Sequence, residues 1–283
     1  MQPLIEKNLL QPYKKTIDLY GQSEKDSIQK RVILGFFCSL YSRMCDINML
    51  IENKSFDSAQ ILMRVAFETQ VYIIYLFKHS SELERKCNAY FYSSYQKYAY
   101  TLSHINETSI ETQDSIIQHS IKTHAFSSDE RKNNLASYLN FHRRKFRESI
   151  PVHSPKLSYE EMGPKDHFKS YPIDNRKWYN DDGKTKTFLN LVQSLKVLNQ
   201  YAALYSPTSD IVHSDSISNH FQAINNELVF AETMDPLMLV FFRKSILDNI
   251  RRLRSLFDDK DQVNEYLNNA RQAYLSNHIN KKG

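Results

Sequence analysis

The residues of this sequence that could do chemistry lie in two short segments. The first holds Arg64 and Glu68, within a run from Ile61 to Phe77 that is otherwise almost entirely apolar. At a spacing of four residues, a guanidinium and a carboxylate lie on the same face of a helix. Burial of an isolated charge is costly, so the pair must bond to itself, to a third polar group or to a ligand. Two interpretations stay open: an ion pair that fixes the helix, and a guanidinium that faces a phosphate or carboxylate.

A second group of reactive side chains lies in the segment from Tyr205 to Asp215, which combines hydroxyls, two carboxylates and an imidazole. Within it, His213 follows the apolar pair Ile211 and Val212, which favours an inward side chain that a neighbouring aspartate would orient. A catalytic histidine and a satisfied structural histidine both stay open. The predicted catalytic residues are Arg64, Glu68 and His213, and the predicted substrate-binding residues are Tyr205, Asp210, Asp215 and Trp178.

Other chemistries have less support in the sequence. The chain lacks a glycine-rich phosphate loop, a G-x-S-x-G elbow, an H-E-x-x-H zinc motif and a D-x-D-x-D-G calcium loop. A metal-dependent hydrolase that uses Glu68, His213 and Asp215 is a minor alternative, and we predict no metal and no cofactor. The three cysteines form no C-x-x-C pair and lie in largely apolar helical patterns, so we expect them to be buried and free.

The composition indicates which elements position these residues. With 5 glycines and 8 prolines in 283 residues, the chain has too few turn formers for a many-stranded sandwich, barrel or Rossmann sheet. Apolar residues recur at helical spacing through most of the sequence, and Ser, Asp, Pro or Gly marks the breaks. We therefore predict an all-α fold, a single-domain bundle of eight or nine helices over residues 1–283.

Two stretches depart from the helical pattern. Residues 151–183 hold many of the prolines and the only tryptophan, so we expect a long irregular surface loop within the bundle. A strand or hairpin arm is expected from Gln222 to Ala231. Between these two stretches, the pattern predicts a helix from Thr185 to Tyr205.

The charge and the aromatic residues permit contact with nucleic acid without requiring it. The formal net charge is +5, and basic residues cluster at 142–147 and 243–254, where we expect solvated helix faces. The helix predicted at 82–105 is crowded with tyrosines. Such rings could stack on bases, but packing into the core is the favoured interpretation.

The sequence gives no indication of a membrane segment. No apolar run approaches the roughly 20 residues that span a bilayer. Charged residues also interrupt the first 21 residues, where a secretory signal would need an apolar core. We expect a cytoplasmic protein with no membrane partner.

Several of these features together resemble one family. They are the run L-M-R-V-A-F-E-T-Q-V-Y-I-I-Y-L around Arg64 and Glu68, the tyrosine-rich helix, R-K-W-Y at 176–179, and the element from Tyr205 to Ser214. In order and spacing they resemble the bacterial domain-of-unknown-function 5677 family, over about 57–220. That family is similar to the HEPN group of helical bundles, found in toxins and abortive-infection proteins that cleave RNA without a metal. The resemblance implies a phage-defence effector, with RNA, a second copy of the chain, and an antitoxin or sensor protein as candidate partners.

The sequence departs from the HEPN signature, in which four to six residues separate an arginine from a histidine. The corresponding positions before His213 hold Ser206, Pro207 and Thr208. The same arginine-to-histidine spacing occurs at two other places in the sequence, which is no more than chance predicts for so short a motif. Arg64, supplied from another helix, would substitute: it would neutralise the scissile phosphate while His213 transfers the proton and Glu68 orients one of the two.

Two functions of different classes stay open. The first is a HEPN-like, metal-independent ribonuclease or toxin effector. The second is a non-catalytic helical binding or regulatory module, in which Arg64, Glu68 and His213 form a buried polar network. The missing arginine before His213 favours the second function, and the polar cluster in an apolar helix favours the first.

Overall fold

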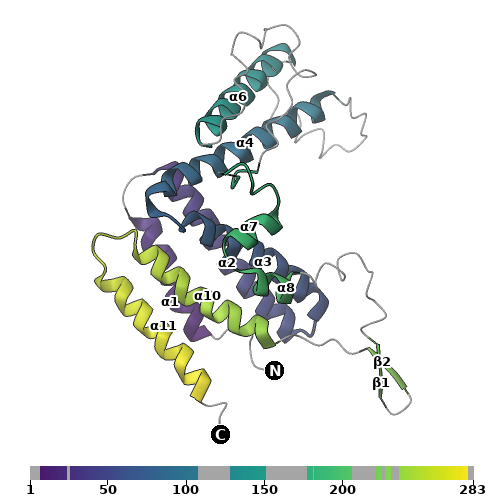
Figure 1. The fold of residues 1–283 in the computed structure, drawn as a ribbon, viewed down its shortest axis with the longest axis vertical. Coiled ribbons are helices and arrows are strands. Elements are labelled where there is room, and N and C mark those ends of the chain that lie inside the picture. Colours follow the sequence, from purple (N-terminus) through teal and green to yellow (C-terminus); the bar gives the residue numbers. More distant parts are fainter. Residues whose placement is uncertain are drawn as a thin grey trace. The chain divides into compact units, whose positions relative to one another are not determined.

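Most of the described chain is helical (Figure 1). The computed structural model describes residues 7–23, 26–107, 128–150, 177–180, 182–205, 221–224, 227–230 and 236–279. The helices in these ranges are α1 (Lys7–Gln22), α2 (Ile28–Glu52), α3 (Phe56–Leu76), the 3-10 helix η1 (Ser80–Glu82), α4 (Leu83–Glu107), α6 (Ser128–Glu148), α7 (Phe188–Ser194), α8 (Leu198–Leu204), α10 (Pro236–Arg254) and α11 (Asp261–Ile279). The predicted all-α fold is confirmed.

The two strands in the described ranges form one antiparallel hairpin. Strand β1 (Phe221–Ile224) pairs with β2 (Glu227–Phe230), with Phe221 opposite Phe230. This pairing confirms the hairpin arm predicted from Gln222 to Ala231. Of the helices in the ranges given above, none is both long enough and apolar enough to cross a bilayer.

The chain groups into two compact units, which we describe separately. Unit 1 consists of Met1–Ser80 with Val192–Gly283, and unit 2 consists of Ser81–Leu191. Arg64, Glu68 and Tyr205 therefore belong to unit 1, whereas Trp178 belongs to unit 2. The prediction of a single domain over residues 1–283 stays a prediction.

The core of unit 1 forms where α2 packs against α3 and where α1 packs against α10 and α11 (Figure 1). Phe37 on the inner face of α2 is fully buried, and its ring lies 6.2 Å from that of Tyr13 and 6.0 Å from that of Phe77. Burial of a side chain of this size contributes about 1.5–3 kcal/mol. Because α3 also packs against α8, Arg64 is brought close to the end of α8.

The cysteines differ in their exposure. Cys87 of α4 is fully buried and Cys45 of α2 is partly buried, but Cys38 of α2 is exposed. The expectation of burial is therefore wrong for Cys38. The reason is its place on the helix, since it follows the inward Phe37 by one residue and is rotated by about 100° from it.

A lysine with a left-handed backbone conformation, Lys196, divides the helical segment before Tyr205 into two helices. One helix was expected over residues 185–205, whereas the structure has α7 and α8 with a break between them. Lys196 has a φ of 58°, and the N–H of Val197 donates to the carbonyl of Val192 at 3.1 Å, as in a Schellman motif. The pattern missed this break because the glycine that usually marks it is absent.

The ends of α2 follow local rules closely. At its start, the hydroxyl of Ser27 accepts a hydrogen bond from the N–H of Lys30 at 3.1 Å, which is an N-cap. At its end, Lys54 has a φ of 60° and the N–H of Ser55 donates to the carbonyl of Leu50 at 2.8 Å. This second Schellman motif fixes the turn between α2 and α3.

In unit 2, α4 packs against α6 through aromatic side chains. The ring of His142 on α6 stacks on Tyr95 of α4 at 5.1 Å and meets Tyr138 edge-on at 4.1 Å. His142 and Arg143 are 6% and 4% exposed, so the expectation of a solvated face at 142–147 is wrong for these two residues. Tyr92 and Tyr95 of α4 pack against the ring of His142 and help to bury it.

The described part of the predicted loop carries a buried aromatic pair. Trp178 and Tyr179 are 6% and 4% exposed, and the ring of Trp178 lies 5.1 Å from that of Tyr90 on α4. The described residues from Lys177 to Gly183 form no helix or strand. Residues 151–176 and 181 of the loop lie outside the described residues.

Candidate functional site

The candidate site lies in unit 1, where α3 meets the end of α8. The Nη2 atom of Arg64 donates a hydrogen bond to the hydroxyl oxygen of Tyr205 at 2.8 Å. The guanidinium carbon also lies 4.1 Å from the centroid of the same ring, within the range of a cation–π attraction. Tyr205 therefore holds Arg64 through both its hydroxyl and its ring face.

Glu68 is the third member of the cluster. Its Oε1 atom lies 3.9 Å from Nε of Arg64, a loose ion pair between residues one helical turn apart. The side chains of Arg64 and Glu68 are 20% and 33% exposed, so the pair lies at the margin of the apolar helix and retains contact with water. The arrangement leaves the guanidinium accessible to a ligand while its orientation is fixed.

The hydroxyl of Tyr205 stays protonated well above neutral pH. Burial raises the pKa of Tyr205 above its usual value, the hydrogen bond from Arg64 lowers it, and the carboxylate of Glu68 raises it. Since the oxygen accepts from Arg64, the proton of the hydroxyl is available to Glu68 or to a bound group.

Two aromatic rings, those of Tyr201 and Phe67, pack against Tyr205. Tyr201, four residues earlier, stacks on Tyr205 with a centroid distance of 4.7 Å and an interplanar angle of 19°. Phe67 lies 6.5 Å from each of the two tyrosines and 5.4 Å from Phe241 of α10. The sequence interpretation missed Tyr201 and Phe67, although two tyrosines at a spacing of four indicate a stack on one helix face.

The structure thus brings together three of the seven predicted residues: Arg64, Glu68 and Tyr205. His213, Asp210 and Asp215 lie outside the described residues, and their roles stay predictions. Trp178 belongs to unit 2, where it packs against Tyr90. In the ranges that the structure describes, no three His, Cys, Asp or Glu side chains are grouped to hold a metal ion.

Comparison with known families assigns the chain to one of them. The sequence profile of a family of unknown function, DUF5677, matches residues 30–228, which is more than half of the 283 residues. The chain belongs to the DUF5677 family. The match confirms the resemblance over residues 57–220 and extends it at both ends. Searches of curated proteins and of solved structures found no significant match to this DUF5677 protein.

Proposed function

We propose that this DUF5677 protein is a HEPN-like, metal-independent ribonuclease in which Arg64 holds the scissile phosphate. The observation that carries the proposal is the fixed guanidinium of Arg64, oriented by Tyr205 and Glu68 and still 20% exposed. A cation that is already in place needs no reorganisation when negative charge develops on a phosphate in the transition state. The same preorganised cation also suits the ground-state binding of RNA.

His213 supplies the proton transfer in this proposal. It would take the proton from a ribose 2′-hydroxyl or protonate the leaving oxygen, and Asp210 or Asp215 would fix its tautomer. His213 lies eight positions after Tyr205, a separation that spans about 26 Å when extended, so the chain length allows His213 to reach Arg64. The hydroxyl of Tyr205 would donate to a non-bridging phosphate oxygen, and Glu68 would keep the guanidinium in place.

Trp178 has no part in this mechanism. It was predicted to bind substrate, but its ring is 6% exposed and packs edge-on against Tyr90. A base needs an open ring face to stack on.

The test is cleavage of total cellular RNA and of transfer RNA by the purified protein in excess chelator, followed on a denaturing gel. We expect the wild type to cut, and His213→Ala to lose about 10²–10⁴-fold in rate. Arg64→Met should lose about 10²–10³-fold, as expected for removal of one group that stabilises the transition state. Circular dichroism confirms that each variant is folded.

Two matched variants control for trace nucleases and for general loss of charge. His79 and Arg271 are exposed residues of unit 1, and neither belongs to the cluster. His79→Ala and Arg271→Met should cut at the wild-type rate. Equal cleavage by the wild type, His213→Ala and Arg64→Met would attribute the activity to a contaminant and remove the proposal.

A second function is favoured by a separate observation, namely that Arg64 already has two partners within the protein, Tyr205 and Glu68. In a non-catalytic binding or regulatory module, the cluster would tie the end of α8 to α3. No RNA cleavage would then be found for any variant, and Arg64→Met would lower the free energy of unfolding by about 1–3 kcal/mol.

Partners belong to the same proposal. A homodimer would bring two clusters into one assembly, and an antitoxin or sensor protein would restrain cleavage until infection. Light scattering on the purified protein measures the first point directly: a mass near 33.4 kDa would show a monomer and remove the homodimer.

A further inference from the structure

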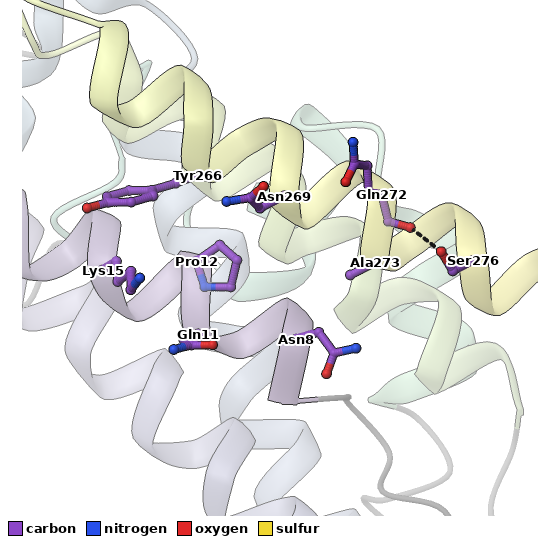
Figure 2. A pocket seen from close by; sticks show the side chains of 9 residues that line it. All are labelled: Asn8, Gln11, Pro12, Lys15, Tyr266, Asn269, Gln272, Ala273 and Ser276. Carbon is purple, nitrogen blue, oxygen red and sulfur yellow. Dashed lines mark hydrogen bonds between the residues drawn. The ribbon is translucent and has the colours of Figure 1, made fainter.

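A groove between α1 and α11 of unit 1 holds polar side chains that the proposed function does not use (Figure 2). Its volume is about 370 Å³, within the range of small-molecule sites. Four side-chain amides line it: Asn8 and Gln11 from α1, and Asn269 and Gln272 from α11. Each amide offers both a donor and an acceptor, so the walls of the groove are suited to a neutral, hydrogen-bonding ring.

Two of the lining residues are compact and leave room between the helices. Pro12 of α1 and Ala273 of α11 both line it, and Figure 2 shows the ring of Pro12 turned towards α11. Proline has no N–H, so the carbonyl of Asn8 lacks its usual donor from the residue four positions later.

One end of the groove carries a cation and an aromatic ring. Nζ of Lys15 lies 5.6 Å from the centroid of the Tyr266 ring. The hydroxyl of Tyr266 accepts a hydrogen bond from Nε2 of Gln262 at 2.8 Å, which fixes the ring. Among the described residues that line the groove, none is a carboxylate and Lys15 carries the one formal charge.

We propose that this groove binds an adenine nucleotide. A side-chain amide pairs with adenine through two hydrogen bonds, one to N6 and one to N7. The ring of Tyr266 contacts the base by stacking or edge to face, and a stacking contact is worth about 1–3 kcal/mol per base. Lys15, at the same end, neutralises one phosphate as a point charge. A cationic ligand is disfavoured because the described lining carries a lysine and no carboxylate.

The test is calorimetric titration of the full chain with AMP, beside adenosine, ribose 5-phosphate and inorganic phosphate. We expect one AMP per chain, about tenfold weaker binding of adenosine, and no binding of the two ligands that lack a base. Asn269→Ala and Lys15→Gln should each weaken AMP about tenfold or more, a loss of about 1.4 kcal/mol.

Asn268 gives a matched control, because it is an exposed amide on α11 that does not line the groove. Asn268→Ala should bind AMP as the wild type does, and melting curves show that the variants are folded. No AMP binding at about 1 mM, or binding that survives both Asn269→Ala and Lys15→Gln, would overturn the inference. Binding of ribose 5-phosphate as tight as that of AMP would also overturn it.

The inference is independent of the ribonuclease proposal. Arg64→Met removes the phosphate-holding group of the candidate site and leaves the groove intact. This variant should therefore lose RNA cleavage and retain AMP binding, and a simultaneous loss of both in a folded protein would contradict the assignment of a separate site.

Discussion

Gln70 of α3 and Asn249 of α10 exchange two hydrogen bonds between their side-chain amides, at 2.8 and 3.2 Å. The two residues are 1% and 0% exposed. Nη1 of Arg252 also donates to Oδ1 of Asn249 at 3.0 Å. An apolar contact between α3 and α10 would tolerate sliding, whereas this amide pair specifies one register between them.

Breaking this pair from one side should destabilise the protein. Asn249→Leu leaves the amide of Gln70 buried without its partner, and we expect the free energy of unfolding to fall by about 1–3 kcal/mol. Gln70→Leu should have a similar effect. The double variant should lose less than the sum of the two, because neither amide then remains unsatisfied. Urea unfolding curves measure all three, and strict additivity would show that the two side chains do not interact.

Tyr13 should make the protein sensitive to alkali. Its side chain is fully buried, and this burial raises the pKa of its hydroxyl far above the usual value. The unfolded chain loses this proton first as the pH rises past about 10, so stability that is complete below that pH is lost above it. Tyr13→Phe should remove this part of the alkaline loss. The free energies of unfolding of the two proteins are compared by urea unfolding between about pH 8 and pH 11. Equal losses of stability in both proteins would show that Tyr13 does not cause the alkaline sensitivity.

His142 should give the stability of the protein the opposite pH dependence, with a loss towards acid pH. Burial lowers the pKa of its imidazole, so the unfolded chain takes up a proton before the folded chain does. Stability is therefore complete above about pH 6.5 and falls as the pH drops through the folded-state pKa. His142→Phe keeps a ring among Tyr95 and Tyr138 but cannot titrate. The difference in unfolding free energy between variant and wild type should grow from about pH 7 to pH 5; a constant difference would refute this role.

The two left-handed lysines are sites for stabilisation. A residue with a side chain pays roughly 1–2 kcal/mol for this backbone conformation, whereas glycine adopts it freely but is more flexible when unfolded. We expect Lys54→Gly and Lys196→Gly each to raise the free energy of unfolding by up to about 1 kcal/mol. Alanine at the same positions retains the strain and serves as the control. A melting temperature that falls with glycine would contradict the expectation.

The long helices could be predicted because their signal is local. In α2 and α3, apolar residues recur at helical spacing over more than 20 residues, and Ser55 occupies the N-cap position of α3. The break at Lys196 could not be predicted in this way, because a lysine is an ordinary helix residue and only the backbone around it reveals the Schellman motif.

The sequence identified residues of the candidate site but did not predict the long-range contact between them. Arg64 and Glu68 attract notice as charges in an apolar helix, and their spacing of four residues predicts their proximity. The bond from Arg64 to Tyr205 joins residues 141 positions apart, and a single sequence carries no signal for such a pair. The burial of His142 was missed for the same reason, since the rings that cover it come mainly from another helix, α4.

The packing of Trp178 against Tyr90 turns the chain's only tryptophan into a spectroscopic reporter for one part of the molecule. Its emission senses the unfolding of unit 2, whereas far-ultraviolet circular dichroism senses the helices of both units. Coincident urea midpoints from the two signals would mean one cooperative folding unit, as the single-domain prediction requires. Separate midpoints would mean that residues 81–191 melt on their own, and the two stabilities could then be engineered independently.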